Sequence, residues 1–129
     1  MPIEVPLGDG TIPVDLPDCT VTVAEPPGAE PVDVGAAAGR ALDSPLGPPL
    51  AARTTSDQDV AIVVTDVTRA TPDDVLLAAL LDRLAAAGVD RDQVTVVIGL
   101  GLHRPMSEEE IATALGEHAD LAVNHDPDA

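Results

Sequence analysis

The side chains best suited to chemistry lie in two short segments of the chain. Asp66, Thr68 and Arg69 belong to the first segment, and His103 with Arg104 belongs to the second. Two guanidinium groups on an otherwise acidic chain make a local site for a carboxylate or a phosphate. The imidazole of His103 is the one group there that can take and return a proton near neutral pH. Together these segments predict an anion site that carries a proton acceptor.

Each of these residues also has a purely structural interpretation. Asp66 could orient His103, or it could form an ion pair with Arg69 that stabilises its own loop. A lone histidine in a loop is more often structural than catalytic. Gly99 and Gly101 let the backbone approach a ligand closely, but the third glycine of a dinucleotide fingerprint is missing. What favours chemistry is the predicted convergence of both charged segments at one edge of a sheet.

The remaining reactive residues predict no metal site and no disulfide. His118 and His125 lack acidic or cysteine partners at the spacing of metal ligands, so we interpret them as surface residues. The single Cys19 excludes an internal disulfide and a zinc site built on cysteines. No cation lies beside it in the sequence to lower the pKa of the thiol, so a reactive cysteine is not expected.

The elements that must position the two segments are strands of a parallel sheet. Residues 60–65 (VAIVVT) and 94–98 (VTVVI) are continuous β-branched runs, typical of strands that are buried on both faces. Between them, Thr71 as N-cap and Pro72 as the first helical residue begin a helix that ends at Gly88. The order strand, helix, strand predicts parallel pairing through a right-handed crossover.

A second helix and a third strand follow. Ser107 and Glu110 have the spacing of a capping box, which predicts the start of a helix, and residues 121–123 open a strand. In an open parallel sheet, ligands bind beyond the carboxyl ends of the strands. Residues 66–69 and 99–106 leave the ends of the first two strands. We therefore expect both loops at the same edge of the sheet.

The first third of the chain is rich in proline and glycine. Residues 3–6 and 11–16 flank Gly8-Asp9-Gly10, which predicts a β-hairpin, and the prolines confine its strands to a sheet edge. Residues 35–42 could form a short helix. We expect one α/β domain, in which the hairpin and an irregular lead-in (residues 1–58) precede a βαβα part (residues 59–129). The parallel-sheet βαβ core of that part spans about residues 59–123.

Composition limits the partners of the protein. The chain has 129 residues, no aromatic residue, and 6 basic against 23 acidic side chains, which gives a net charge of −17. Such a surface repels nucleic acids and anionic membranes, and it offers no aromatic platform for bases. The acids are spread along the chain, which is typical of a solvated shell. No segment has the pattern of a leader peptide or a membrane span, so we expect a cytoplasmic protein.

The two loops together resemble a known family. Residues 66–72 (DVTRATP) have the pattern D-x-T-R-x-x-P, and residues 101–110 (GLHRPMSEEE) have the pattern G-x-H-R-P-x-[ST]-x-E-E. Both are similar to loops of the amino-terminal domain of nickel-dependent lactate racemase. Residues 41–47 (ALDSPLG) and 124–126 (NHD) resemble segments of the same domain more weakly.

This resemblance implies a substrate, a cofactor and roles for the loop residues. The substrate would be lactate or another 2-hydroxy acid. The cofactor would be a nickel pincer nucleotide, a pyridinium-3,5-bisthiocarboxylic acid mononucleotide that holds nickel. By motif match, His103 would take the proton of the substrate hydroxyl while a hydride moves to the cofactor and then returns to the opposite face. Asp66, Thr68, Arg69 and Arg104 would bind the cofactor or the substrate, with Arg104 also supporting its loop.

The chain departs from the family pattern in what it lacks. The family tethers its cofactor through a lysine later in the chain, and a nickel-ligating histidine and a second catalytic histidine also lie there, whereas this chain has no lysine. We therefore expect a part of the enzyme that is inactive alone, either a fragment or one half that pairs with a separate chain carrying the downstream domain. The alternative is a non-catalytic anion- or nucleotide-binding module, or an inactive remnant of the family.

Overall fold

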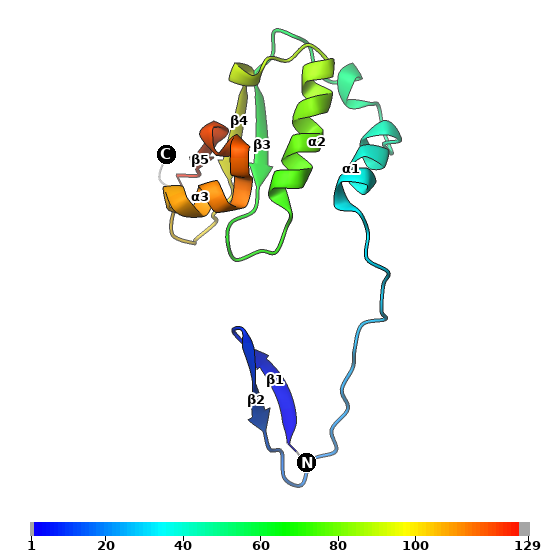
Figure 1. The fold of residues 1–129 in the computed structure, drawn as a ribbon, viewed down its shortest axis with the longest axis vertical. Coiled ribbons are helices and arrows are strands. Elements are labelled where there is room, and N and C mark those ends of the chain that lie inside the picture. The colour runs from blue at the N-terminus through cyan, green and yellow to red at the C-terminus, as the bar shows by residue number, and fades with distance from the viewer. Residues whose placement is uncertain (1, 127–129) are drawn as a thin grey trace. The chain divides into compact units, whose positions relative to one another are not determined.

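The computed structural model describes residues 2–126, and the chain divides after Pro31 into two compact units. The amino-terminal unit is an antiparallel hairpin of β1 (Ile3–Leu7) and β2 (Gly10–Val14) (Figure 1). Gly8 has a φ of +57° and starts the two-residue turn, a conformation that glycine adopts at no steric cost. The expected hairpin is therefore confirmed, and each of its two strands is an edge strand.

The larger unit is a parallel sheet covered by helices. In chain order its elements are α1 (Val34–Asp43), the 3-10 turn η1 (Leu50–Ala52), β3 (Val60–Val64), α2 (Asp73–Ala86), η2 (Arg91–Gln93), β4 (Val94–Ile98), α3 (Glu108–Leu115), η3 (Gly116–Leu121) and β5 (Ala122–Asn124). The strands pair in parallel in the order β3-β4-β5, so the central strand is β4. This arrangement confirms the predicted α/β class, the preceding hairpin and the third strand. Residues 32–58 contribute α1 and η1 to the same unit as the sheet.

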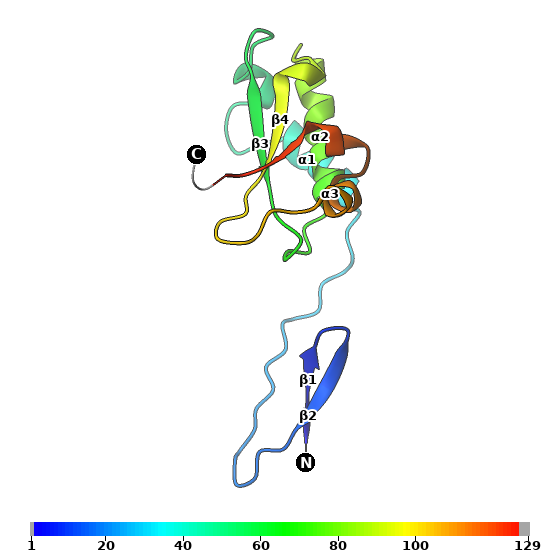
Figure 2. The ribbon, with the colours of Figure 1, turned by 90° about the vertical axis from the view of Figure 1, so that its left-hand side faces the viewer.

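The core lies between one face of the sheet and the helices. Val96 and Ile98 of β4 are almost fully buried, together with Leu77 of α2 and Leu115 of α3. Both crossovers place their helix on this face, and α1 packs on α2 from outside. In Figures 1 and 2, α1 and α2 lie on the same side of β3 and β4. The arrangement fixes the carboxyl ends of the strands and hence the loops that leave them.

One prediction about the strands is wrong. Continuous β-branched runs predicted burial on both faces, yet Ala61 and Val63 of β3 and Thr95 of β4 are exposed, with Val63 at 71%, and Val97 of β4 is only partly buried. The reason is topological. Two right-handed crossovers that progress in the same direction across a sheet place both helices on the same face. Within residues 2–126, no element of the larger unit covers the other face.

The helix starts differ in how closely they follow the sequence signals. Ser107 caps α3, and Glu110 completes the capping box as predicted. For α2, the predicted N-cap at Thr71 is wrong by one residue, because Pro72 occupies the cap position and no side chain caps the helix. Its first turn instead holds Asp73, whose carboxylate accepts a hydrogen bond from the Thr65 hydroxyl at 2.7 Å. Among the described residues, no helix is long and apolar enough to cross a bilayer.

Candidate active site

The two predicted loops share one pocket at the carboxyl ends of β3 and β4. The backbone N–H of Gly99 donates to the carbonyl of Val64 at 2.9 Å and so joins the two strand ends. A Cβ at Gly99 would lie 3.3 Å from Cγ1 of Val63 and 3.4 Å from the Val64 carbonyl oxygen, so the strand ends leave little room for a side chain there. The pocket measures about 570 Å³ and is lined by residues 63–66, Arg69 and residues 99–103.

The loop after β4 is anchored on both sides of His103. Leu100 is buried, and its carbonyl accepts a hydrogen bond from the His103 backbone N–H at 3.0 Å. Gly101 lies inside this turn with a φ of +58°. A residue with a side chain would be strained in this backbone conformation. Met106 is buried further along. The turn therefore holds His103 at the pocket, while Leu100 and Met106, three residues to either side, enter the core.

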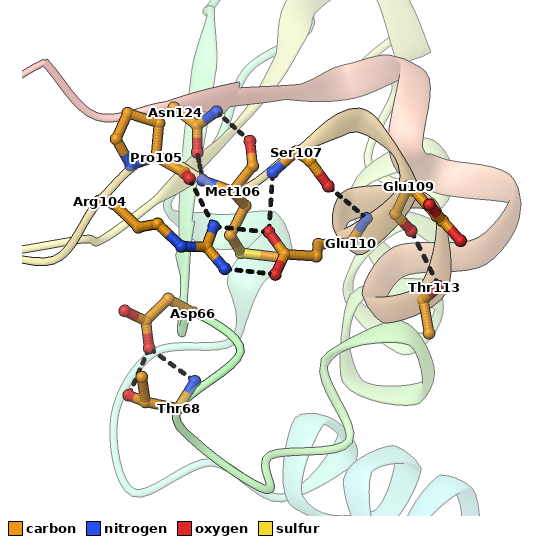
Figure 3. Close-up of polar contacts among 10 residues, drawn as sticks. All are labelled: Asp66, Thr68, Arg104, Pro105, Met106, Ser107, Glu109, Glu110, Thr113 and Asn124. Carbon is orange, nitrogen blue, oxygen red and sulfur yellow. Dashed lines mark hydrogen bonds and ion pairs between the residues drawn. The ribbon is translucent and has the colours of Figure 1, made fainter.

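Asp66 organises the first loop and reaches across to the second. Its side chain is only 5% exposed. Its Oδ1 accepts hydrogen bonds from the Thr68 hydroxyl at 2.6 Å and from the Thr68 N–H at 3.0 Å (Figure 3). Its Oδ2 is hydrogen-bonded to Nδ1 of His103. The Thr68 hydroxyl and then His103 lower the pKa of Asp66 to about 2, so this carboxylate is ionised at neutral pH.

The contact with Asp66 sets the orientation of the His103 ring. An ionised carboxylate can only accept a hydrogen bond, so Nδ1 must carry the proton that Asp66 receives. In the neutral ring, Nε2 is then the nitrogen with the free lone pair. The side chain is 51% exposed, and it lines the pocket. His103 therefore has one nitrogen held by the protein and one available to a ligand.

Arg69 supplies a positive charge to the same pocket. Its backbone N–H donates to the carbonyl of Asp66 at 3.0 Å, which closes the turn after β3. Its guanidinium makes no hydrogen bond or ion pair with the part of the chain that the structure describes. Asp66 thus pairs with His103 rather than with Arg69, which decides between the two roles that the sequence left open. The charge of Arg69 is available to an anion in the pocket.

Arg104 lies next to the site in sequence but faces a different partner. Its guanidinium makes a bidentate ion pair with Glu110, with Nη1–Oε2 and Nη2–Oε1 distances of 2.8 and 2.6 Å (Figure 3). Hydrogen bonds from Arg104 and then from the Ser107 backbone N–H lower the pKa of Glu110 to about 2. Arg104 is not among the residues that line the pocket. In this structure it ties the end of the loop to the first turn of α3.

Asn124 holds the same loop from the third strand, a role that the sequence did not reveal. Its Oδ1 accepts the Met106 N–H, and its Nδ2 donates to the Met106 carbonyl, both at 2.9 Å (Figure 3). The side-chain amide thus pairs with the backbone of Met106 as a neighbouring strand would. Only its position could have indicated this role, because Asn124 is the last residue of β5, at the edge of the sheet where the loops lie.

The residues outside the pocket offer little further chemistry. Among residues 2–126, no group of three or more His, Cys, Asp or Glu side chains could hold a metal ion. The side chain of His118 contacts Arg91, which also binds Asp120 at 2.6 Å, and Cys19 is exposed. The pocket that joins Asp66, Arg69 and His103 can bind a small anion and accept a proton from it. That combination suits an acid with a hydroxyl near its carboxylate.

Comparison with known proteins shows the family of this chain and a related solved structure. The model of the family described as "Lactate racemase N-terminal domain" matches residues 7–127. The structure of the lactate racemase apoprotein from Thermoanaerobacterium thermosaccharolyticum is similar to this chain, with a TM-score of 0.71 and 26% sequence identity. The match covers 98% of this chain but only 30% of that chain. No curated protein sequence matches significantly.

Proposed function

Since the chain belongs to the family of lactate racemase N-terminal domains, we propose that it is the amino-terminal part of a racemase or epimerase of lactate or another 2-hydroxy acid. One observation carries this proposal. His103, oriented by the ionised Asp66, and Arg69, whose guanidinium has no partner among residues 2–126, line one pocket at the carboxyl ends of two parallel strands. The proposal extends to a cytoplasmic location and to the use of a nickel pincer nucleotide by the complete enzyme.

Arg69 is proposed to bind the carboxylate of the substrate. Its guanidinium is exposed in the pocket, and a planar guanidinium matches a carboxylate through two parallel hydrogen bonds. On an otherwise strongly acidic chain, this local positive charge is what allows a small anion to enter. Binding there would leave the 2-hydroxyl of the same molecule free to reach His103. The loop residues thus position the two functional groups of a hydroxy acid separately.

His103 is proposed to move the proton of the substrate hydroxyl. Asp66 keeps the proton of the neutral ring on Nδ1, so the lone pair on Nε2 can accept the hydroxyl proton. The ring that results carries a positive charge, and the ionised Asp66 beside it stabilises that charge. The same nitrogen returns the proton when the hydroxyl forms again. Thr68, which donates two hydrogen bonds to Asp66, acts through that residue.

We propose that the residues of this chain do not by themselves hold the cofactor that the family uses. The chain has no lysine to tether it. Among residues 2–126, no cluster of His, Cys, Asp or Glu side chains could hold nickel. The proposed enzyme therefore needs further polypeptide, either in a longer chain or as a separate partner, to hold the nickel cofactor, which would supply the hydride acceptor. We expect the isolated chain neither to retain nickel nor to racemise lactate.

A second candidate rests on the same pocket. The positive charge of Arg69 in the pocket and the missing lysine also suit a module that binds an anion or a nucleotide without catalysis. The two candidates differ in what they require of His103. Catalysis needs its Nε2, whereas anion binding by Arg69 does not.

The test is a hybrid enzyme made with the cofactor-producing proteins. In the hybrid, this chain replaces the matched 30% of the lactate racemase from T. thermosaccharolyticum. Conversion of L- to D-lactate and the reverse would be followed for the wild-type hybrid, for His103→Ala, and for His118→Ala as a matched control outside the pocket. We expect His103→Ala to lower kcat by about 10²- to 10⁴-fold, the usual contribution of a general acid-base group, while His118→Ala keeps the activity. Equal activities for the wild type and His103→Ala would remove His103 from the reaction.

A further inference from the structure

The open face of the sheet carries a row of three valines. The strand register aligns Val63 of β3 with Val97 of β4, and Val97 with Val123 of β5. The exposed fractions are 71% for Val63 and 48% for Val123, and Val97 is partly exposed. In the next row of the same face, Ala61 pairs with Thr95, and both are exposed. The valine row (Val63, Val97 and Val123) thus lies within an uncharged strip across all three strands.

An uncovered apolar face of this kind is unusual for a parallel sheet. Parallel sheets occur almost only where both faces are covered. Here the crossovers from β3 through α2 to β4, and from β4 through α3 to β5, progress in the same direction across the sheet. Right-handed crossovers in that direction cover only the face that α2 and α3 already occupy. A crossover that covers the valine row would have to run in the opposite direction, to a strand beside β3.

We propose that the valine row is the docking surface for the rest of the racemase polypeptide, which lies outside this chain. The inference rests on the proposed function. The related lactate racemase is more than three times as long as the part that matches, since this chain covers 30% of it while 98% of this chain is used. A second copy of this chain is a poor occupant, because each copy carries a net charge of −17.

The position of the valine row connects docking with the pocket. Val63 lines the pocket that contains Asp66, Arg69 and His103, and it lies beside Gly99 at the end of β4. A segment that covers Val63 would therefore form an additional wall of that pocket. Such a wall would exclude water from the ion pair between Arg69 and a bound carboxylate, which strengthens the pair. Docking thus completes the substrate pocket as well as the fold.

Cysteine accessibility tests the proposal without relying on catalysis. Cys19, the only native cysteine, is exposed and would be replaced by serine. Single cysteines would then be introduced as Val63→Cys, Val123→Cys and, as a control, Leu46→Cys at a fully exposed position. Each variant would be labelled with a maleimide in the isolated chain, at low and high concentration, and in the hybrid with the rest of the T. thermosaccharolyticum enzyme.

We expect both sheet cysteines to react readily in the isolated chain at any concentration. In the hybrid their labelling should slow by at least about tenfold, because labelling then needs local opening, while Leu46→Cys stays unchanged. Protection in the dilute isolated chain would assign the face to the hairpin unit, and protection only at high concentration would assign it to a second copy. Either result overturns the proposal, as would equal labelling in the hybrid and the isolated chain. A hybrid that is protected in Val123→Cys but inactive with all of its native valines would support docking while contradicting the proposed function.

Discussion

The tautomer of His103 depends on the ionised carboxylate of Asp66, so Asp66→Asn should change it. In the wild type, Asp66 accepts the Nδ1 proton and leaves Nε2 free. An asparagine amide has nearly the same shape, but it can donate from its NH₂ group as well as accept through its oxygen. When the amide donates to Nδ1, the ring proton moves to Nε2, and Nε2 can no longer accept a substrate proton.

The size of the effect follows from the kind of hydrogen bond that is lost. A hydrogen bond to a charged group contributes about 1.5–3 kcal/mol. With RT near 0.6 kcal/mol, this energy raises the ratio of the Nδ1–H to the Nε2–H tautomer of the neutral ring by about 10- to 150-fold, compared with a ring that lacks this hydrogen bond. The Asp66→Asn variant should lose most of this preference. Catalysis by the hybrid enzyme should then fall by up to about 10⁴-fold, the loss that a wrong tautomer causes in a comparable carboxylate–histidine pair.

Nitrogen-15 NMR of the isolated chain measures the tautomer directly and needs no cofactor. The chain has three histidines, so the ring signals can be assigned with His118→Ala and His125→Ala variants. The matched control is Asp57→Asn. Asp57 also accepts a threonine hydroxyl, from Thr55 at 2.6 Å, but it does not line the pocket.

Two results would show that Asp66 does not set the tautomer of His103. The first is a wild-type His103 ring that carries its neutral proton mainly on Nε2, because Asp66 would then not hold Nδ1. The second is a ring whose tautomer ratio is the same in the wild type and in Asp66→Asn. A shift caused by Asp57→Asn as well would show that the change is not specific to the pocket.

Three further predictions concern stability. The pKa values of Asp66 and Glu110 are lowered to about 2 from ordinary values of 3.8 and 4.5. Both ionised carboxylates therefore stabilise the folded state at pH values above the ordinary pKa, and this stabilisation is lost as the pH falls toward 2. In urea unfolding at several pH values, Glu110→Gln should show a weaker loss of stability in acid than the wild type. Ser107→Ala removes the side-chain cap of α3 and should lower the free energy of unfolding by about 1 kcal/mol in urea titrations, with a change near zero contradicting the capping role. Leu77→Ala empties a site that is 1% exposed and should cost about 2–5 kcal/mol, whereas Leu46→Ala at a fully exposed site should cost almost nothing in the same titrations.

The fold was predictable where short-range signals agree with the packing. The run at 94–98 became β4 without a shift at either end, and the Ser107–Glu110 spacing became the predicted capping box. The uncovered sheet face was not predictable from the same signals. Val63 is as apolar as its buried neighbours, and the type of a residue does not tell which face of the sheet the helices cover. That depends on the direction of both crossovers and on polypeptide beyond them.

The site was predictable as a neighbourhood but not as a set of partners. Both loops leave neighbouring strand ends, so their meeting followed from the parallel order alone. The partner of Asp66 lies 37 residues away in the chain, and the choice between His103 and Arg69 depends on how each loop turns. Arg104 also carried no sequence signal for its ion pair with Glu110, because that glutamate was already explained by the capping box.

In the proposed enzyme, the two loops form one site in which Arg69 binds the carboxylate of a 2-hydroxy acid and His103 meets its hydroxyl. Titration of the isotopically labelled chain with lactate, and separately with propionate, which lacks the hydroxyl, tests it most directly. Lactate should shift the side-chain signals of Arg69 and His103 together along one saturation curve, while propionate should shift those of Arg69 with little effect on the His103 ring. Identical His103 shifts from both acids, or no response of either residue to lactate, would contradict it.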